Sequence, residues 1–450
     1  MRRDLLVYSP IVLGSILRLG IPLLAGNLSI YLYRLADSIM IGRLGVEQLA
    51  AIGVASVYTA LHEMFVWPVG LGAQAIASRR FGRSGAAASA AAAGVLTDAR
   101  WAGLAAGTFA FALSLFAPLL VHAFAASSAG HALGYGAISR IAFPVMGLAA
   151  AHRGYLGAVH RTRVIMLSIV TSNALNVLGN AIFIYGWGPA PALGVRGAAV
   201  GTVLAHLLNV AILVLAVRSR GAVRIPWTLR LAGIGAVLRL GAPVSLQNAF
   251  AMGVILAFQA IMGTVGAAAQ GVTHAIFSVF RLNKTLVGGF ANGTSILVGN
   301  ALGARDDDRA LRAIRSQQML AGVIGMGVTM FTLGNPGLVG AIFALEAPAD
   351  RLFVDGLRFF AIFFLIEIMA YSLEVVFTHN GYGHWVLVSE VATNLLGTIG
   401  TAAVAVLVFG LGHRGGWAGF ALYQVGHAVL LMIAYRRRRW LSVSVESAHG

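Results

Sequence analysis

The sequence predicts an all-α membrane protein with twelve transmembrane helices in two six-helix lobes related by a pseudo-two-fold axis. Composition, the placement of basic residues and an internal duplication lead to this fold class. Of the 450 residues, 58% are hydrophobic and only 10% are Asp, Glu, Lys or Arg, against roughly 25% charged residues in an ordinary soluble domain. So few charges cannot cover a water-soluble globule of this length. Soluble, disordered and nucleic-acid-binding classes are therefore excluded.

Long apolar runs supply the spans, because a membrane-crossing helix needs about 20 mostly apolar residues. The runs are continuous rather than alternating, which excludes a strand-based barrel. The chain has no cysteine, so a disulfide framework or a cysteine-based zinc cluster is also excluded. We expect spans near residues 12–36, 46–76, 94–121, 132–152, 164–186, 195–217, 240–262, 268–299, 317–344, 357–378, 385–410 and 416–435.

The basic residues indicate the orientation, because Lys and Arg concentrate in cytoplasmic loops. Most of the 32 basic residues fall on one side of the membrane when the N-terminus is placed in the cytoplasm. We therefore expect a multi-pass protein of the plasma (inner) membrane with both termini inside. The expected cytoplasmic segments carry Arg2, Arg3, Arg18, Arg79, Arg80, Arg83, Arg100, Arg153, Arg161, Arg163, Arg218, Arg220, Arg224, Arg230, Arg239, Arg305, Arg309, Arg312, Arg315 and Arg436 to Arg439.

The second half of the sequence repeats the first. LRLGIPLLAGN (17–27) aligns with LRLGAPVSLQN (238–248) at an offset of 221 residues. Further matches at this offset are Pro22 with Pro243, Gly72 with Gly293 and Gly82 with Gly303. Six spans in each half keep both halves in the same orientation, so the axis should run along the membrane normal, with substrate bound between the halves.

We divide the chain into an N-lobe (1–217), a cytoplasmic linker (218–239) and a C-lobe with a basic tail (240–450). No P-loop motif occurs, so the chain does not hydrolyse ATP by that route. A duplicated membrane protein of this kind is interpreted as a secondary transporter rather than an enzyme.

Five stretches spread over nearly the whole chain match the motifs of one transporter family. They are LADSIMIGRLGVEQLAAIG (35–53), GLGAQAIASRRFGR (70–83), NALNVLGNAIFIYG (173–186), LGVRGAAVGT (193–202) and ANGTSILVGNALGAR (291–305). On these motifs the chain resembles the multidrug and toxic compound extrusion (MATE) family. The resemblance implies export of amphipathic, often cationic, compounds driven by H⁺ or Na⁺.

We therefore expect a multidrug efflux antiporter that works by alternating access. We expect it to act as a monomer among membrane lipids, with no ATPase subunit and no cofactor besides its coupling ion. One alternative is a lipid-linked oligosaccharide flippase of similar two-lobed plan, which would need a strongly cationic cavity. A less favoured one is an intramembrane enzyme, but the histidines and acids show no catalytic or metal-binding spacing. The sequence leaves open which compounds are carried, and whether H⁺ or Na⁺ is the coupling ion.

Polar residues inside the first-half spans form a candidate cation site, since ionisable groups within a bilayer are costly and usually serve a pathway. Asp37 lies near the outer end of the first span, and Asn176 and Asn180 share one face of the fifth. At ~1.5 Å per residue, Asp37, Asn180 and Thr202 lie at a similar depth. A carboxylate with amide and hydroxyl oxygens could bind Na⁺ or a proton, and burial favours the neutral carboxyl.

The family resemblance implies the same cluster, because the family's N-lobe cation site falls on residues matching Asp37, Asn176, Asn180 and Thr202. Asp37, Asn176 and Asn180 would be the metal ligands if the ion is Na⁺. Some family members carry Asp where Asn180 stands, so the choice of ion stays open. The alternative is that the asparagines only join helices and that Asp37 pairs with Arg34 one turn earlier.

A second set of polar residues is expected to line a substrate cleft or to couple the lobes. Glu63 on the second span is the repeat mate of Lys284 on the eighth, and residues related by a two-fold axis can meet near it. We therefore expect an ion pair between Glu63 and Lys284, the alternative being that each charge pairs within its own lobe or reaches water in the cavity. The other members of this set are Arg281, Glu367, Gln247 and Asn248.

Overall fold

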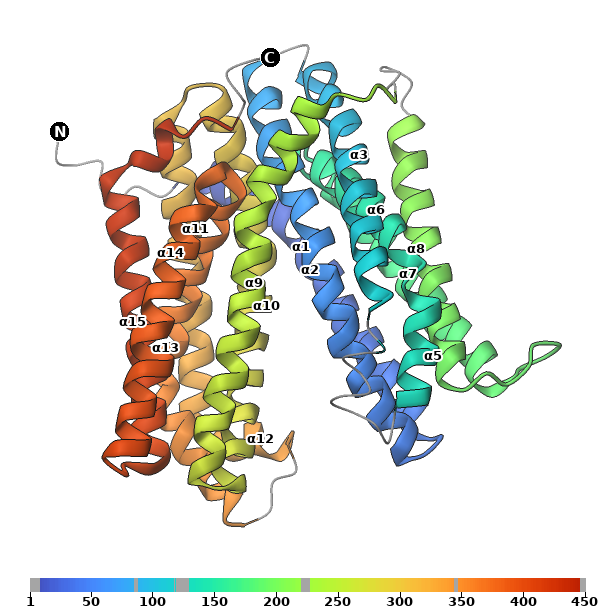
Figure 1. Cartoon of the computed structure of the whole chain (residues 1–450). Helices are drawn as coiled ribbons and strands as arrows, with labels where there is room; N and C mark the ends of the chain where they lie inside the picture. The colour runs from blue at the N-terminus through green and yellow to red at the C-terminus, as the bar shows by residue number, and fades with distance from the viewer. Residues whose placement is uncertain are drawn as a thin grey trace. The chain divides into compact units, whose positions relative to one another are not determined.

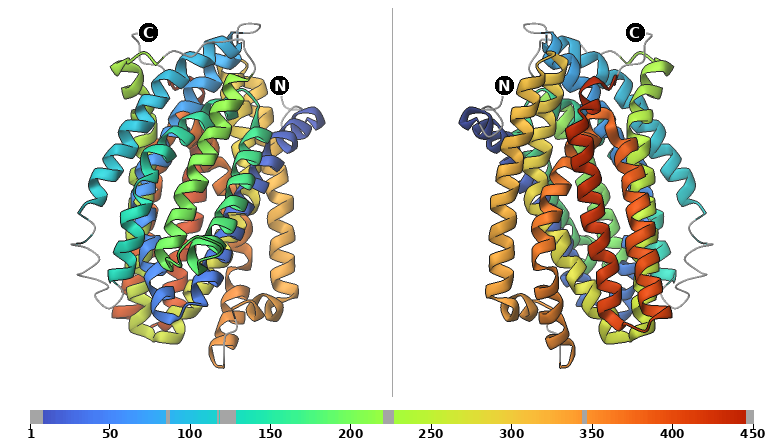
Figure 2. Two further views of the ribbon diagram at one scale, coloured as in Figure 1. Left: turned by 90° about the vertical axis from the view of Figure 1, so that its right-hand side faces the viewer. Right: turned by 90° about the vertical axis from the view of Figure 1, so that its left-hand side faces the viewer.

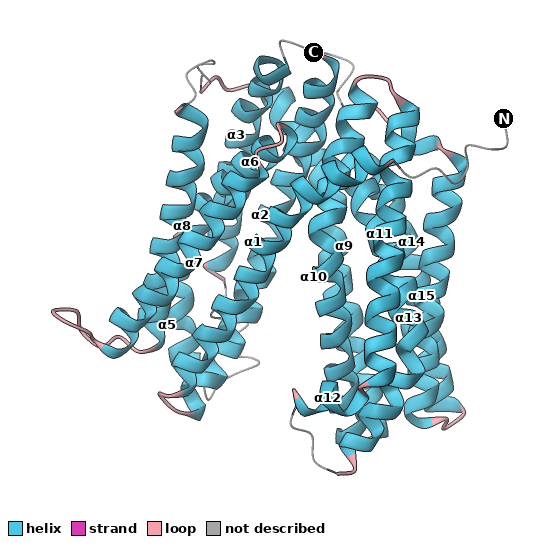
Figure 3. Cartoon of the chain, turned by 180° about the vertical axis from the view of Figure 1, so that it is seen from behind, coloured by secondary structure: helices cyan, strands magenta, loops and turns pink. Residues whose placement is uncertain are grey.

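Helices form nearly all of this protein. The computed structural model describes residues 9–84, 88–116, 118, 129–219, 227–343 and 347–445, and no strand occurs among them (Figure 3). The expected all-α fold class is therefore confirmed. Four residues of the expected cytoplasmic segments lie outside the described residues, namely Arg2, Arg3, Arg220 and Arg224.

Long helices follow one another along the chain with short connections (Figure 1). Those of the first half are α1 (Pro10–Gly42), α2 (Val46–Arg83), α3 (Ala88–Ser114), α5 (Ala129–Ser139), α6 (Ala142–Ala158), α7 (Thr162–Tyr185) and α8 (Val195–Arg218). Those of the second half are α9 (Leu231–Val265), α10 (Ala267–Gly303), α11 (Asp307–Gly334), α12 (Pro336–Ala341), α13 (Ala349–Phe377), α14 (Gly383–Thr393) and α15 (Gly412–Arg437). Wider π turns cover Thr378–Tyr382, Asn394–Thr401 and Val404–Val408, and a 3-10 turn covers Arg439–Ser442.

Within the described residues the twelve expected spans fall on helices, and the differences lie at helix ends and breaks. The fourth span consists of two helices, α5 and α6, with a 48° bend between them. Helix α9 begins at Leu231, inside the stretch expected to be linker. The ninth expected span covers most of α11, which ends at Gly334, and the short helix α12, which begins at Pro336; its expected end at residue 344 lies outside the described residues. Proline lacks the amide hydrogen that would continue the preceding helix.

By length and composition alone, six of the described helices are apolar enough to cross a membrane, or seven if the bent pair is one span. Helices α2 and α10 are not among them, and both carry polar and charged side chains. They contain 38 and 37 residues, respectively, well above the ~20 residues that a span requires. Their polar side chains are therefore candidates for function rather than arguments against spanning.

The chain forms two compact units that do not coincide with its two halves. Unit 1 contains the described residues up to Gly20, Leu246–Val298 and Asp307–Val443. Unit 2 contains Ile21–Ser245, Gly299–Asp306 and the described residues after Val443. Each half of the sequence therefore contributes the start of its first helix to the other half's unit.

Close glycine contacts show that this exchange follows the duplication. In unit 1, α1 packs on α10 so closely that a Cβ at Gly20 would lie 3.1 Å from the Gly289 oxygen. In unit 2, α9 packs on α2, and a Cβ at Gly241 would lie 2.6 Å from the Pro68 oxygen. The repeat offset relates Gly20 to Gly241 and Pro68 to Gly289. The duplication of the sequence is therefore also a duplication of helix contacts.

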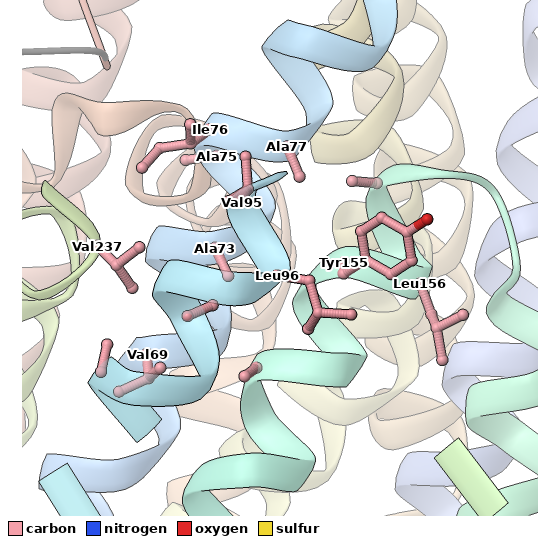
Figure 4. Close-up of a cluster of buried hydrophobic side chains, with 14 of the residues drawn as sticks. Val69, Ala73, Ala75, Ile76, Ala77, Val95, Leu96, Tyr155, Leu156 and Val237 are labelled. Carbon is pink, nitrogen blue, oxygen red and sulfur yellow. The ribbon is translucent and has the colours of Figure 1, made fainter. Parts of the chain in front are cut away.

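Unit 2 packs its helices closely on small side chains. Helices α2, α3 and α6 contact one another around buried alanines together with Leu96 and Leu156 (Figure 4). Where α3 meets α6, a Cβ at Gly147 would lie 1.9 Å from the Gly103 oxygen. Small residues allow membrane helices to approach this closely. Helices α7 and α8 run alongside each other in the same unit (Figure 2).

Unit 1 is packed with aromatic side chains instead. Its helix α13 contacts both α11 and α15, and their shared core includes Phe353, Phe360, Phe364 and Trp417, all at most 1% exposed. Aromatic rings bury large apolar areas and prefer tilted or edge-to-face contacts. The two repeats therefore share a helix order but fill their interiors with different chemistry.

Replacement of Gly147 by Ala tests the close contact between α3 and α6. The added methyl group would overlap the Gly103 carbonyl, so we expect the free energy of unfolding to fall by about 1–3 kcal/mol. Gly53→Ala in α2 is the control, because nothing lies within 4 Å of the Cβ position there and Ala favours a helix over Gly. Thermal unfolding in detergent should give a lower midpoint for Gly147→Ala only. Equal midpoints for the two variants would contradict this contact.

Candidate functional site

Helices α1, α7 and α8 of unit 2 carry the candidate cation site. Helices α7 and α8 pack together, and a Cβ at Gly179 would lie 3.2 Å from the Gly201 Cα atom. Helix α7 ends at Gly186, whose φ of 76° is readily adopted only by a residue without a side chain. The chain then turns back into α8, so the asparagine-bearing face of α7 lies beside α8.

Hydrogen bonds join the four residues expected at this site. Asn180 donates from Nδ2 to Asp37 Oδ1 at 2.5 Å. The orientation of the Asn176 amide that satisfies its neighbours points its nitrogen at Asp37 Oδ1 (3.1 Å) and its oxygen at the Thr202 hydroxyl (3.2 Å). Asn176 and Asn180 are 1% and 0% exposed. The structure therefore brings Asp37, Asn176, Asn180 and Thr202 into one polar cluster.

One buried oxygen of this cluster lacks a hydrogen-bond partner among the described residues. This atom is Asn180 Oδ1, and it faces α8 where a Cβ at Gly201 would lie 2.3 Å away. An unsatisfied buried acceptor costs free energy, which a cation beside it would recover. Asp37 and Thr202 also line a cavity of about 120 Å³, so there is room for water or an ion next to the carboxylate.

The alternative ion pair between Asp37 and Arg34 is not the one observed. The Arg34 guanidinium lies 3.7 Å from Glu63, and no ion pair joins it to Asp37 in the described part of the chain. Asn173, on the same helix as Asn176, donates to the Ser29 hydroxyl of α1 at 2.8 Å. One asparagine of α7 therefore joins helices, while Asn176 and Asn180 surround the carboxylate.

The corresponding position of the second repeat is aromatic. Asp37 corresponds to Phe258 at the offset of 221, and Thr202 corresponds to Phe420 at the offset of 218 that applies near the end of each repeat. These two rings stack with their centroids 6.1 Å apart in unit 1, and Phe258 is fully buried. The cation cluster is therefore not duplicated, although the backbone around it is.

Unit 1 contains a different network of buried and half-buried charges. Lys284 Nζ lies 3.1 Å from Glu367 Oε1. Gln247 donates from its amide nitrogen to Glu374 Oε1 at 2.7 Å and also to Glu390 Oε2. Glu367 and Glu390 are 4% and 7% exposed. Three carboxylates, one ammonium group and one amide therefore lie within the second-half helices.

Only some of the residues expected to line a substrate cleft or to couple the lobes lie close to one another. Gln247, Lys284 and Glu367 belong to the buried network of unit 1. Arg281 and Asn248 are exposed, and no side-chain hydrogen bond or ion pair joins either of them to this network in the described residues.

Glu63 and Lys284 each have an ion-pair partner within their own unit. Glu63 of unit 2 lies beside Arg34, and Lys284 of unit 1 lies beside Glu367. This arrangement is the alternative that the sequence left open. A pair between Glu63 and Lys284 themselves stays a prediction.

Three further polar residues in the second-half helices were not among the residues predicted to form a site. Glu374, Glu390 and His427 sit in apolar runs, and their only signal is an ionisable side chain at membrane depth. Arg153, which was counted with a cytoplasmic segment, lies within α6, 4.2 Å above the ring of Trp67. Counting basic residues between spans cannot separate a loop arginine from one that lies inside a helix bundle.

A duplicated helical membrane protein with charged groups buried inside its helix bundles has the design of a membrane transporter. The family model MatE matches residues 22–182 and 243–403, one stretch in each repeat. The chain belongs to the MatE family, whose members are transporters and not enzymes. The family resemblance read from the sequence is confirmed.

Relatives and solved structures agree with this assignment. The chain is 29% identical over 374 residues to the probable multidrug resistance protein NorM of Pseudomonas aeruginosa, with 76% of this chain and 72% of that protein covered. It is 27% identical over 453 residues to the NorM protein of Deinococcus radiodurans, with coverage of 95% and 96%. A MOP superfamily transporter from Pyrococcus furiosus superposes with a TM-score of 0.87 at 22% identity, with 96% and 97% covered. A MATE transporter in its bent conformation also gives 0.87 at 22% identity, with 96% and 98% covered.

The Lys284–Glu367 contact can be tested with a double-mutant cycle. Lys284→Met leaves a buried carboxylate without its cation, so we expect a loss of roughly 3–5 kcal/mol in the free energy of unfolding. Adding Glu367→Gln should recover most of that loss, because the unpaired charge is removed. Arg281→Met is the control, since its cation is exposed on the same helix. Additive losses in the double variant, measured by unfolding in detergent, would contradict the ion pair.

Proposed function

We propose that this multidrug efflux transporter is a cation-coupled antiporter, which exports amphipathic compounds, cationic ones among them, in exchange for H⁺ or Na⁺ at Asp37. Its family and its NorM relatives, which are probable multidrug resistance proteins, support multidrug efflux. The coupling rests on one observation, the buried contact of Asn180 with Asp37 beside an amide oxygen that has no partner in the described residues. The proposed cycle needs no ATPase subunit and no cofactor.

The proposed coupling follows from the charge of a single side chain. Without a cation, the amide donors of Asn176 and Asn180 stabilise the Asp37 carboxylate. A proton removes this negative charge, and a sodium ion compensates it. Either event changes the strength of the hydrogen bonds from the two amides to Asp37, so the contacts between α1 and α7 can rearrange.

Alternating access sets a condition on this site. A ligand shifts an equilibrium between two states only by its different affinity for them. Asp37 must therefore meet the exterior in one state and be closed off in the other, while substrate affinity falls when the cation is bound. The cavity beside Asp37 gives the ion a place from which to reach the carboxylate.

Asp37→Asn tests the coupling directly. The amide can neither take up a proton nor supply a full negative charge to Na⁺, so we expect cation-driven dye efflux to fall to the background of empty vesicles. The control is Asp350→Asn, which removes an exposed carboxylate and should leave efflux at the wild-type rate. The measurement is ethidium transport in everted membrane vesicles at matched protein levels.

The same vesicles identify the ion when a pH gradient and a Na⁺ gradient are imposed separately. Gly201→Ala adds a methyl group against Asn180 Oδ1, and we expect it to reduce efflux driven by whichever ion is used. Wild-type efflux from Asp37→Asn under both gradients would rule out the proposed role of Asp37.

We also propose that the protein lies in the plasma (inner) membrane and that both of its termini face the cytoplasm. The chain contains no cysteine, so single cysteines can be introduced and labelled. A membrane-impermeant maleimide added to intact cells should label Pro189→Cys and leave Asp308→Cys unlabelled until the cells are opened. The reverse pattern would contradict this orientation.

A further inference from the structure

A second cavity in unit 2 is lined by more positive than negative side chains. It shares part of its wall with the cavity beside Asp37, including Arg34, Glu63 and Thr202, and Asn176 of the cation cluster also lines it. Its wall includes Arg34, Arg153, His206, Glu63 and Trp67, contributed by α1, α6, α8 and α2. Two guanidinium groups carry a fixed positive charge, and Glu63 provides the only carboxylate among the described residues of this wall. Arg153 was counted with a cytoplasmic segment, so the sequence did not predict the excess of positive charge in this wall.

The contacts of the two arginines leave their positive charge only partly compensated. Glu63 lies 3.7 Å from the Arg34 guanidinium and accepts a hydrogen bond from Trp67 Nε1 at 3.3 Å. Arg153 stacks over the Trp67 ring and donates from Nε to the Ala149 oxygen at 3.5 Å, and no ion pair joins it to a carboxylate in the described residues. One acid therefore serves two cations in a membrane-embedded wall, where unpaired charge is costly.

Two further polar atoms of the wall are unsatisfied. Ser172 Oγ and Asn209 Oδ1 have no hydrogen-bond partner in the part of the chain that is described, and their residues are 4% and 6% exposed. The Ser172 hydroxyl can donate a hydrogen bond to a ligand that enters the cavity. Both residues line the same space as the two arginines.

The size of the cavity limits what it can hold. Its volume is about 60 Å³, and one water needs roughly 10–15 Å³ on this measure. It therefore has room for a small polar head group but not for a whole drug-sized molecule. The rest of such a molecule would have to lie outside, next to the Trp67 side of the wall.

We propose that this cavity binds the carboxylate group of an amphipathic substrate, with Arg34 and Arg153 as the groups that recognise it. Guanidinium groups form short, charge-assisted hydrogen bonds with carboxylates, and the Ser172 hydroxyl adds a third donor. This inference rests on the proposed export function and specifies its substrate class, namely amphiphiles with a free acid group, zwitterions included. Purely cationic compounds would gain nothing from this cavity.

A pair of dyes that differ in a single methyl group tests the inference. Rhodamine 110 carries a free carboxylate, and rhodamine 123 is its methyl ester. We expect the purified protein in nanodiscs, with no ion gradient, to bind the acid roughly 10-fold more tightly than the ester, since a charged hydrogen-bonding group is lost in the ester. Fluorescence anisotropy titrations give both dissociation constants.

Three variants locate the preference. Arg153→Gln and Arg34→Gln should each lower affinity for the acid to that for the ester while leaving ester binding unchanged. Arg140→Gln is the matched control, because Arg140 also stacks on an aromatic ring, that of Phe111 at 5.8 Å, but lies outside this cavity. Arg34 is exposed, so Arg34→Gln keeps the test decisive if Arg153→Gln does not fold.

Several results would overturn the inference. A wild-type protein that binds the two dyes equally, or a preference for the acid that survives in both Arg34→Gln and Arg153→Gln, shows that the cavity does not recognise carboxylates. Dioctanoyl phosphatidylglycerol provides the phosphate comparison. Arg153-dependent binding of this lipid, without any preference for the acid dye, would assign the cavity to lipid head groups instead.

Transport separates this inference from the proposed function. Efflux of rhodamine 123 from everted vesicles without any binding preference for the acid would refute only the carboxylate site. A preference for the acid in binding, with neither dye exported under either ion gradient, would support the carboxylate site and refute the proposed export.

Discussion

The hydrogen bond from Asn180 to Asp37 is the contact on which the functional account of this protein depends. A carboxylate at membrane depth is costly unless donors stabilise it, and the donors here are amides of one helix. The face of α7 that carries these amides also packs closely on α8 through Gly179 and Gly201. Gly201 also lets Asn180 Oδ1 lie against α8, where a Cβ would be only 2.3 Å away, and this buried oxygen has no hydrogen-bond partner in the described residues.

The two repeats keep the same backbone contacts but carry different side chains in their interiors. Gly20 of α1 contacts α10, and its repeat equivalent Gly241 of α9 contacts α2 in the same way. The two repeats therefore share this helix arrangement. At the position of Asp37 the second repeat has Phe258, within an aromatic core. Its own charges lie elsewhere, around Lys284 and Gln247. A duplicated scaffold has therefore produced one cluster suited to a cation and a separate ion-paired network.

The sequence predicted what depends on regular helix geometry. A rise of ~1.5 Å and 3.6 residues per turn placed Asp37, Asn180 and Thr202 at a similar depth and Asn176 and Asn180 on one helical face, and the structure joins these residues. It could not place Arg153, because charge counting treats every arginine near a span end as a loop residue. The bonds of Gln247 to two glutamates on other helices depend on tertiary packing, which local spacing does not encode. Pro336 indicates that α11 ends early, but the residues after it are apolar, so the sequence predicted one continuous span.

Difference infrared spectroscopy of the purified protein can detect cation or proton binding at Asp37. We predict a carboxyl signal that appears in the wild-type protein on acidification or changes when Na⁺ is added. This signal should be missing in Asp37→Asn under the same conditions. Spectra of wild type and Asp37→Asn that superimpose in both titrations would show that Asp37 binds neither ion, and would contradict the account.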